Sequence, residues 1–434
     1  MKRQLIILLS LVACLSLAAQ TTRKEMYRHL EYTGSNYCSY FGGKTKLSKA
    51  PEGYKPFYIS HYGRHGSRYM LSNKAYHETI AILQKADSAG VLTKLGKKTL
   101  RKLRVAYADA TGRAGELTRL GGRQHEGIAE RMYRRFPEVF TRGSRIQAYS
   151  TLVHRCQESM QFFCGRLKHL NHDIDIYQRT DKEDSYFMQF AKVDLPDGPL
   201  QHEIDSITRH LEDSLYHSVD ITPRLFTDLG WIDRNVKDRY RLTYRFYDIA
   251  SDMQCVPELK LSFTNLFTKE ELYNLWYEGN YGWSVGHGFM DGTKPRYLNV
   301  HNLLRHIMEA ADKGLKQDHS NATLRFGHDT YVVPLAYLFG FDGVRQFPDP
   351  AHLRDMPSYY TDFRVTPMGA NIQLIFFRKP GSDDVLVQFM LNEVEKTLPI
   401  ASDCAPFYHW KDVRAFIERR LAQVPQRENK NKKE

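Results

Sequence analysis

The sequence predicts an α/β protein in which a central, mostly parallel sheet is flanked by helices and interrupted by a mainly helical insertion. A short apolar strand, a polar loop and a helix follow one another three times, at 57–68, 146–155 and 324–330. Residues 171–317, between the second and third units, are rich in Tyr, His and charged residues and show few strand signals. A chain of 434 residues, 42% apolar and 26% charged, suits one globular domain with a large insertion, or two domains.

The first residues, MKRQLIILLSLVACLSLAAQ, have the features of a secretory signal peptide. Lys2 and Arg3 precede an apolar run that ends in small residues, so we expect residues 1–19 to be removed. An alternative is that LVAC is a lipoprotein processing site with a lipid anchor on Cys14. No other apolar run approaches the roughly 18 residues of a membrane span. We therefore expect a periplasmic or secreted protein without an integral membrane span.

Periodicity assigns the elements of the first half of the chain. FYISHY at 57–62 reads as a buried strand, and a mostly helical region runs from about residue 74 to residue 140. SRIQAYST at 144–151 is a second candidate strand. It leads into a helix whose apolar face consists of Val153, Cys156, Met160, Phe163, Cys164 and Leu167.

The second half contains the insertion and the end of the sheet. Helices are expected near 201–217, 268–280 and 300–314, and a short strand, a polar loop and an apolar helix at 322–341. NIQLIFFRK and DVLVQFMLN read as a hairpin whose turn is KPGSDD, followed by a last helix around 411–422. The expected organisation is a signal peptide at 1–19, a discontinuous α/β domain at 20–170 and 318–424, a helical cap insertion at 171–317 and a disordered charged tail at 425–434.

The net charge bears on the binding partner, and the cysteines bear on disulfide bonds and structural zinc. The formal charge of +12, lowered by two if the leader is removed, admits a nucleic acid, an anionic membrane or a phosphorylated small molecule as partner. The five cysteines after the leader form an odd set, so at least one is unpaired within a monomer. Cys156 and Cys164 lie about 12 Å apart if they share a helix, too far to bridge. No CxxC pair or regular Cys/His grouping predicts structural zinc.

The most informative stretch is YISHYGRHGSRYM at 58–70, which places Arg64, His65 and Arg68 around Gly66 at the end of a strand. Groups of like charge repel one another, so their gathering indicates an anion. The loops after parallel strands meet at the carboxyl edge of an α/β sheet, where ligands bind. We therefore expect one cluster of six side chains: Arg64, His65, Arg68, Arg155, His328 and Asp329.

This cluster has the chemistry that phosphoryl transfer requires. Guanidinium groups match phosphate oxygens, so the three arginines would neutralise a phosphate dianion and no metal or other cofactor is expected. A neutral His65 would attack phosphorus once its other ring nitrogen donates to a fixed acceptor. His328 would bind a nonbridging oxygen. Asp329 would protonate the departing alcohol and later take a proton from water.

RHGSR at 64–68 and GHDT at 327–330 resemble the two signature motifs of the histidine acid phosphatases, clade 2 of the histidine phosphatase superfamily. GELTRLGGRQHEGIAERMYRRF, YSTLVHRCQESMQFF and the closing hairpin resemble the family's intervening segments in the same order. The resemblance implies a phosphoglycerate mutase-like sandwich with a cap, and phytase-like or multiple inositol polyphosphate phosphatase-like activity. It also implies His65 as nucleophile, Asp329 as proton donor, and Arg64, Arg68, Arg155 and His328 as phosphate pocket.

Two of the site residues also have a plain structural interpretation. Asp329 suits a helix N-cap before TYVVPLAYLF, and Arg155 suits a surface ion pair. His61 and His65 are four residues apart, as in some metal sites, but on a strand they would not share a helical face. Tyr69 and Met70 stand where phytases of the family commonly carry a proline, and HDT stands where inositol polyphosphate phosphatases usually have HAE.

Taken together, the sequence predicts an exported, metal-independent phosphomonoesterase that acts through phosphohistidine on inositol polyphosphates or sugar phosphates. The partner expected is an anionic phosphorylated small molecule and not a nucleic acid. The alternatives are a phosphomutase, which uses a similar histidine, and a non-catalytic surface binder of phosphorylated ligands. Export disfavours the first, and the presence of both His65 and Asp329 disfavours the second.

Overall fold

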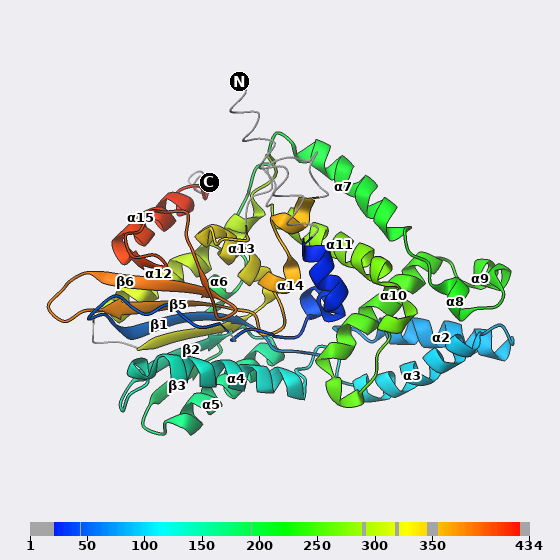
Figure 1. The fold of residues 1–434 in the computed structure, drawn as a ribbon, viewed down its shortest axis with the longest axis horizontal. Helices are drawn as coiled ribbons and strands as arrows, with labels where there is room; N and C mark the ends of the chain where they lie inside the picture. The colour runs from blue at the N-terminus through cyan, green and yellow to red at the C-terminus, as the bar shows by residue number, and fades with distance from the viewer. Residues whose placement is uncertain are drawn as a thin grey trace, which may run out of the picture.

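A mixed sheet forms the centre of the larger lobe of the molecule (Figure 1). The computed structural model describes residues 21–43, 45–191, 193–288, 292–316, 321–344 and 355–425. The predicted signal peptide with Cys14, and the tail after residue 425, lie outside these residues. In spatial order the strands are β3 (Asp175–Arg179), β2 (Arg145–Ser150), β4 (Ala322–Gly327), β1 (Lys55–Arg64), β5 (Asn371–Arg378), β6 (Val385–Leu391) and β7 (Val394–Lys396), with β8 (Phe407–His409) pairing to β6.

The direction of the strands divides the sheet into two parts. β3, β2, β4 and β1 run parallel to one another, whereas β5 is antiparallel to β1 and β6 is antiparallel to β5. The predicted hairpin is confirmed, because Ile372 pairs with Leu391 and Arg378 pairs with Val385. Most strands therefore share one direction, and the predicted α/β class is confirmed.

Helices cover both faces of this sheet (Figure 1). Residues alternate along β1, so that Ile59 packs in one apolar cluster and Tyr58 and Tyr62 pack in another. The Ile59 face is covered by α4 (Arg119–Arg135) and α5 (His154–Leu170). The Tyr58 face is covered by α12 (His301–Leu315), α13 (Asp329–Phe339) and α15 (Trp410–Leu421).

A smaller, helical lobe combines two distant segments of the chain. α2 (Lys74–Ser88) and α3 (Lys94–Ala110) share an apolar core with residues 219–275, and Figure 1 shows them beside the green helices of that segment. Those helices include α8 (Thr222–Leu225), α9 (Leu229–Asn235) and α10 (Arg239–Asp252). This part of the insertion thus packs on α2 and α3, which the sequence grouped with the sheet.

The expected helices of the insertion are present, with additions. α7 (Gln201–Tyr216), α11 (Lys269–Gly286) and α12 occupy the three expected ranges, and α6 (Ser185–Met188), α8, α9 and α10 were not anticipated. α11 begins with a capping box, in which Thr268 and Glu271 satisfy each other's backbone N–H groups. β3 lies inside the range assigned to the insertion but pairs with β2, so the sheet extends beyond residue 170. β3 escaped sequence analysis because its mixed exposure gives it no apolar pattern.

In the described part of the chain, no helix is both long and apolar enough to cross a membrane. The five cysteines there, Cys38, Cys156, Cys164, Cys255 and Cys404, are all free thiols. Cys156 and Cys164 share α5, as the apolar spacing predicted.

Candidate active site

The polar loops after three neighbouring strands meet at one edge of the sheet. Arg64 ends β1 and pairs in register with Gly327, the last residue of β4. Ser150, the last residue of β2, pairs with Phe326. His65 and Arg68 follow β1, Arg155 lies in the first turn of α5, and His328 and Asp329 follow β4. The parallel register therefore brings all six predicted side chains to the same edge.

His65 is held as a neutral imidazole with one ring nitrogen free. The side chain is buried, and its Nδ1 lies 2.9 Å from the carbonyl oxygen of Gly66, so Nδ1 carries the hydrogen and donates it. The backbone of His65 is fixed on both sides, because its N–H donates to Gly327 and its carbonyl accepts from Gly369. Burial, and then the charges of the surrounding arginines, hold the pKa of His65 well below its usual range. This favours the neutral ring, in which Nε2 keeps its lone pair.

Arg64 is the central cation of the cluster. Its guanidinium is completely buried, and its Nη1 donates to the carbonyl oxygens of Asn36 and Thr366, each at 2.6 Å. Its Nη2 lies 2.8 Å from Oδ2 of Asp329. These contacts orient the guanidinium group but leave some of its N–H groups without a hydrogen bond, so Arg64 can still bind a phosphate oxygen.

Arg68 and Arg155 complete the positive wall. Arg68 donates from Nη1 to the carbonyl of Tyr69 at 3.0 Å, and its guanidinium lies over the ring of Tyr37, 5.0 Å from the centroid. The Nε atoms of Arg64, Arg68 and Arg155 are all buried and have no hydrogen-bond partner among the described residues. A buried cationic N–H without a partner is costly, so three of them around one imidazole indicate a site built for an anion.

His328 and Asp329 face this wall from the start of α13. The rings of His65 and His328 lie 5.7 Å apart, edge to face. Burial and the charge of Arg155 lower the pKa of His328 to about 4, which keeps it neutral. Burial opposes the charge of Asp329, but the guanidinium groups of Arg64 and Arg68 outweigh it and hold its pKa below the usual range. In the free protein Asp329 is thus an anion paired with Arg64.

Two alternative interpretations of these residues do not fit the geometry. The N-cap of α13 is His328, and Asp329 is the first helical residue, which accepts a hydrogen bond from the N–H of Thr330 at 2.9 Å. His61 lies in an aromatic environment beside Phe163 and Phe326, both within 5.6 Å of its ring centroid. His61 belongs to β1, whereas His65 lies in the loop that follows it. The alternation of side chains along a strand therefore does not place the two histidines on one face.

Three contributors to the site escaped sequence analysis. Asn36 donates to Oδ2 of Asp329 at 3.0 Å, and Tyr37 lies under Arg68; both belong to η1 (Leu30–Tyr37), near the N-terminus. His287, at the end of α11, is close enough to Asp329 and Thr330 for both to act on its pKa, which burial lowers. No motif marks these residues, because they reach the site from segments that lie far away in sequence.

Comparison with solved structures gives a consistent match, although no protein-family model and no curated protein sequence matches this chain. The apo multiple inositol polyphosphate phosphatase of Bifidobacterium longum has a TM-score of 0.72 at 19% identity, covering 89% of this chain and 97% of that one. Its complex with phosphate has a TM-score of 0.71 at 19% identity, covering 90% and 98%. The phytase of D. castellii has a TM-score of 0.64 at 14% identity, covering 91% and 86%.

These similarities extend over most of both chains. The identities are low, so they bear on the fold. They agree with the resemblance carried by RHGSR at 64–68 and GHDT at 327–330. The chain therefore shares its fold with the inositol polyphosphate phosphatase of Bifidobacterium longum and the phytase of D. castellii.

Proposed function

We propose that this chain is a metal-independent phosphomonoesterase that works through a phosphohistidine at His65. The observation that carries the proposal is the neutral imidazole of His65 beside three guanidinium groups, each with a buried Nε that lacks a partner among the described residues. A simple binding site for phosphate needs the arginines but not a nucleophile. This distinguishes the proposal from the alternative of a non-catalytic binder.

In the first step, Nε2 of His65 attacks phosphorus while the bond from phosphorus to the leaving oxygen breaks. Arg64, Arg68 and Arg155 stabilise the charge that spreads over the equatorial oxygens. His328 donates one N–H to a nonbridging oxygen. Nδ1 keeps its hydrogen and donates it to the Gly66 carbonyl, so the phosphorylated ring is cationic and a good leaving group for the second step.

Asp329 supplies the proton for the leaving alcohol. In the free protein its pKa is held down by Arg64 and Arg68 despite burial. A bound phosphate dianion neutralises those same cations, so we expect the pKa of Asp329 to rise and the carboxyl to take up a proton as substrate binds. Asp329 gives this proton to the leaving oxygen. It then removes a proton from the water that attacks phosphorus and breaks the N–P bond.

The substrate class is proposed from charge and from the relatives. The Bifidobacterium longum phosphatase, which shares the fold, forms complexes with phosphate and with inositol hexasulfate. The strongly basic balance of this chain also favours a highly anionic substrate. We therefore propose inositol polyphosphates first and sugar phosphates second, met outside the cytoplasm after export, with a lipid anchor at Cys14 as the alternative to a free protein. A phosphomutase would need a phosphorylated substrate pool that an exported protein does not meet.

The test is phosphate release from phytate and from a panel of sugar phosphates, with EDTA present, for the wild type and for His65→Ala. We expect turnover that survives EDTA and falls by at least a thousandfold in the variant, because the arginines alone cannot provide covalent catalysis. His169→Ala, an exposed histidine on α5, is the control and should retain full activity. Rapid quenching in alkali should trap a phosphoryl group on His65. Equal turnover in His65→Ala and wild type would contradict the mechanism, and phosphate binding without any turnover would support the binder.

A further inference from the structure

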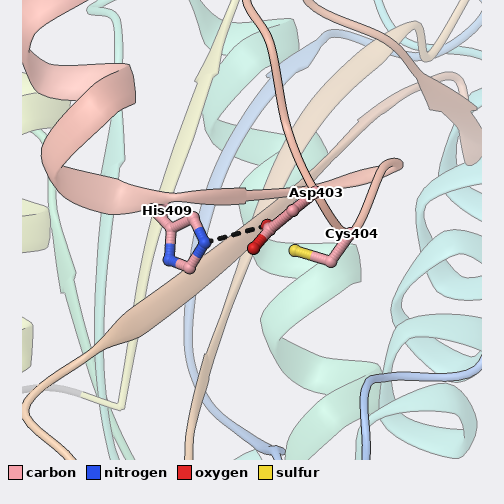
Figure 2. Close-up of side chains that lie close together, drawn as sticks. All are labelled: Asp403, Cys404 and His409. Atoms are coloured by element: carbon pink, nitrogen blue, oxygen red, sulfur yellow. Dashed lines mark hydrogen bonds and ion pairs between the residues drawn. The ribbon is translucent and has the colours of Figure 1, made fainter.

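A second cluster of reactive side chains lies on the loop that leads into β8 and α15. Asp403, Cys404 and His409 each offer one oxygen, sulfur or nitrogen atom, and these atoms all lie within 4.8 Å of one another (Figure 2). His409 pairs with Leu386 at the start of β6, which in turn lies beside Phe377 of β5 and so near the start of β1. The cluster is therefore at the opposite end of the sheet from His65.

The imidazole of His409 is oriented as in a metal site. Its Nδ1 lies 2.9 Å from Oδ1 of Asp384, and that carboxylate is itself held by the hydroxyl of Tyr54 at 2.8 Å. An outer carboxylate that takes the Nδ1 hydrogen leaves Nε2 with its lone pair, and this arrangement is typical of zinc-bound histidines. Nε2 of His409 faces Oδ1 of Asp403 at 3.0 Å (Figure 2).

The loop holds the thiol of Cys404 beside these groups. The N–H of Cys404 donates to Oγ of Ser402 at 3.2 Å, Oγ of Ser402 donates to the carbonyl of Phe407 at 2.5 Å, and the N–H of Phe407 donates to the carbonyl of Cys404 at 3.0 Å. Cys404 is also the one cysteine that is not fully buried among the residues described. The turn therefore presents an accessible sulfur in a conformation that its own hydrogen bonds maintain.

We propose that Asp403, Cys404 and His409 bind a divalent cation of the zinc type, with Asp384 as the outer partner of His409. A carboxylate, a thiolate and an imidazole are ligands that Zn²⁺ accepts in a tetrahedral site, with water as the fourth. The thiol disfavours Mg²⁺ and Ca²⁺, which prefer oxygen ligands. On binding, Cys404 releases its proton to solvent, and His409 binds through Nε2 as a neutral ring.

A purely structural interpretation is a protonated His409 between two carboxylates. That arrangement explains Asp384 and Asp403, and the Cys404 sulfur then only donates to the Phe407 carbonyl at 3.5 Å and contacts Oγ of Ser402 at 3.6 Å. It does not require the sulfur to lie within 4.8 Å of both the carboxylate and the imidazole. Because the bound cation would tie the loop at 402–404 to the start of α15, its effect is on stability and not on phosphate release. The inference is thus independent of the proposed catalytic mechanism.

The test uses the mature full-length protein, kept reduced by a phosphine, and Co²⁺ as a spectroscopic probe for Zn²⁺. We expect one Co²⁺ per chain with a thiolate-to-cobalt charge-transfer band and the strong visible bands of a tetrahedral site, both abolished by Zn²⁺. Cys404→Ser should lose the charge-transfer band, and His409→Gln should weaken binding at least tenfold. Asp384→Asn should weaken it by about 10–100-fold.

The matched control is His217→Gln, which removes an exposed histidine that pairs with Asp213 and belongs to no group of three possible metal ligands among the described residues. Its Co²⁺ spectrum should equal that of the wild type. Thermal unfolding of each variant without metal checks that the fold is intact, and Zn²⁺ should raise the midpoint of the wild type but not of Cys404→Ser. A wild-type protein without the charge-transfer band, or Cys404→Ser with unchanged binding, would overturn the site.

Discussion

At the scale of single residues, the electrostatic balance around Asp329 decides how the proposed reaction begins. Arg64 contacts Asp329 directly, and the same guanidinium faces the position proposed for phosphate. Arg64 therefore pairs first with the Asp329 carboxylate and then with the phosphate of the substrate. Once Arg64 binds phosphate, burial favours the neutral, protonated form of Asp329.

Asp329→Asn tests this role through the leaving group. We expect turnover of phytate or a sugar phosphate to fall by about 10²–10⁴-fold, because an alkoxide cannot depart without a proton. Turnover of p-nitrophenyl phosphate should fall much less, since nitrophenolate is a stable anion. Loss of the contact with Arg64 would affect both substrates alike, so the ratio of the two effects isolates proton donation. Equal losses on both substrates would remove Asp329 from the acid role.

At the scale of elements, the loop carrying His65 is positioned by close contact with the start of α4. The N–H of Ser67 donates to Oε1 of Gln124, and the N–H of Thr118 donates to the carbonyl of Ser67. The two backbone segments lie so close together that glycine is required at both position 66 and position 121. A Cβ on Gly66 would lie 2.4 Å from the carbonyl oxygen of Gly121, and a Cβ on Gly121 would lie 2.3 Å from that of Ser67.

Gly121→Ala should therefore lower both stability and activity. The added methyl group meets backbone and cannot be accommodated by a side-chain rotation, so we expect a loss of about 1–3 kcal/mol in the free energy of unfolding. The displaced loop should also lower kcat. Gly165→Ala on α5 is the matched control, because its Cβ would have no atom within 4 Å and should stabilise the helix by ~0.5–1 kcal/mol. Urea unfolding and phosphate release measure the two effects, and a Gly121→Ala protein as stable and active as the wild type would contradict the close-contact argument.

At the scale of the whole molecule, buried histidines limit how acid a solution the fold tolerates. His61 and His125 are buried beside Phe163 and Phe326, and burial lowers the pKa of each to about 3. In the unfolded chain these groups have a pKa near 6.5. Between the two values the unfolded state binds more protons, so the folded state is favoured above pH 6.5 and loses stability as the pH falls toward 3.

His125→Phe should weaken this dependence. The ring keeps its aromatic contacts, and one titrating group is removed, so the slope of unfolding free energy against pH should decrease by about 1.4 kcal/mol per pH unit between pH 6 and 4. Urea unfolding at several pH values measures the slope. His169→Asn, at an exposed position of α5, should leave it unchanged. An unchanged slope in His125→Phe would show that other groups control acid unfolding.

The packing of distant segments explains why the two lobes were harder to predict than the sheet. α2 and α3 have ordinary amphipathic patterns, and nothing in such a pattern says which partner covers the apolar face. In the structure that partner is the segment around α10, more than a hundred residues later in the sequence. The whole-molecule packing therefore joins segments that local pattern assigned to different domains.

The sequence by itself determined the strand–loop–helix units, the parallel part of the sheet, the closing hairpin and the six candidate site residues. These depend on local features, namely buried apolar runs, glycine-containing loops and charged residues after strands, which neighbouring residues alone specify. Parallel register then requires such loops to meet at one edge.

Only the tertiary structure decided the contributions of Asn36, Tyr37 and His287, the pairing of β3, and the cluster of Asp403, Cys404 and His409. Asn36 and Tyr37 contact the site because η1 packs against α11, α10 and α14 (Asp362–Val365), and no periodicity records that contact. His409 gains its orientation from Asp384 across the sheet. Contacts between distant segments arise from packing and burial in three dimensions, and that information is absent from any short stretch of the chain.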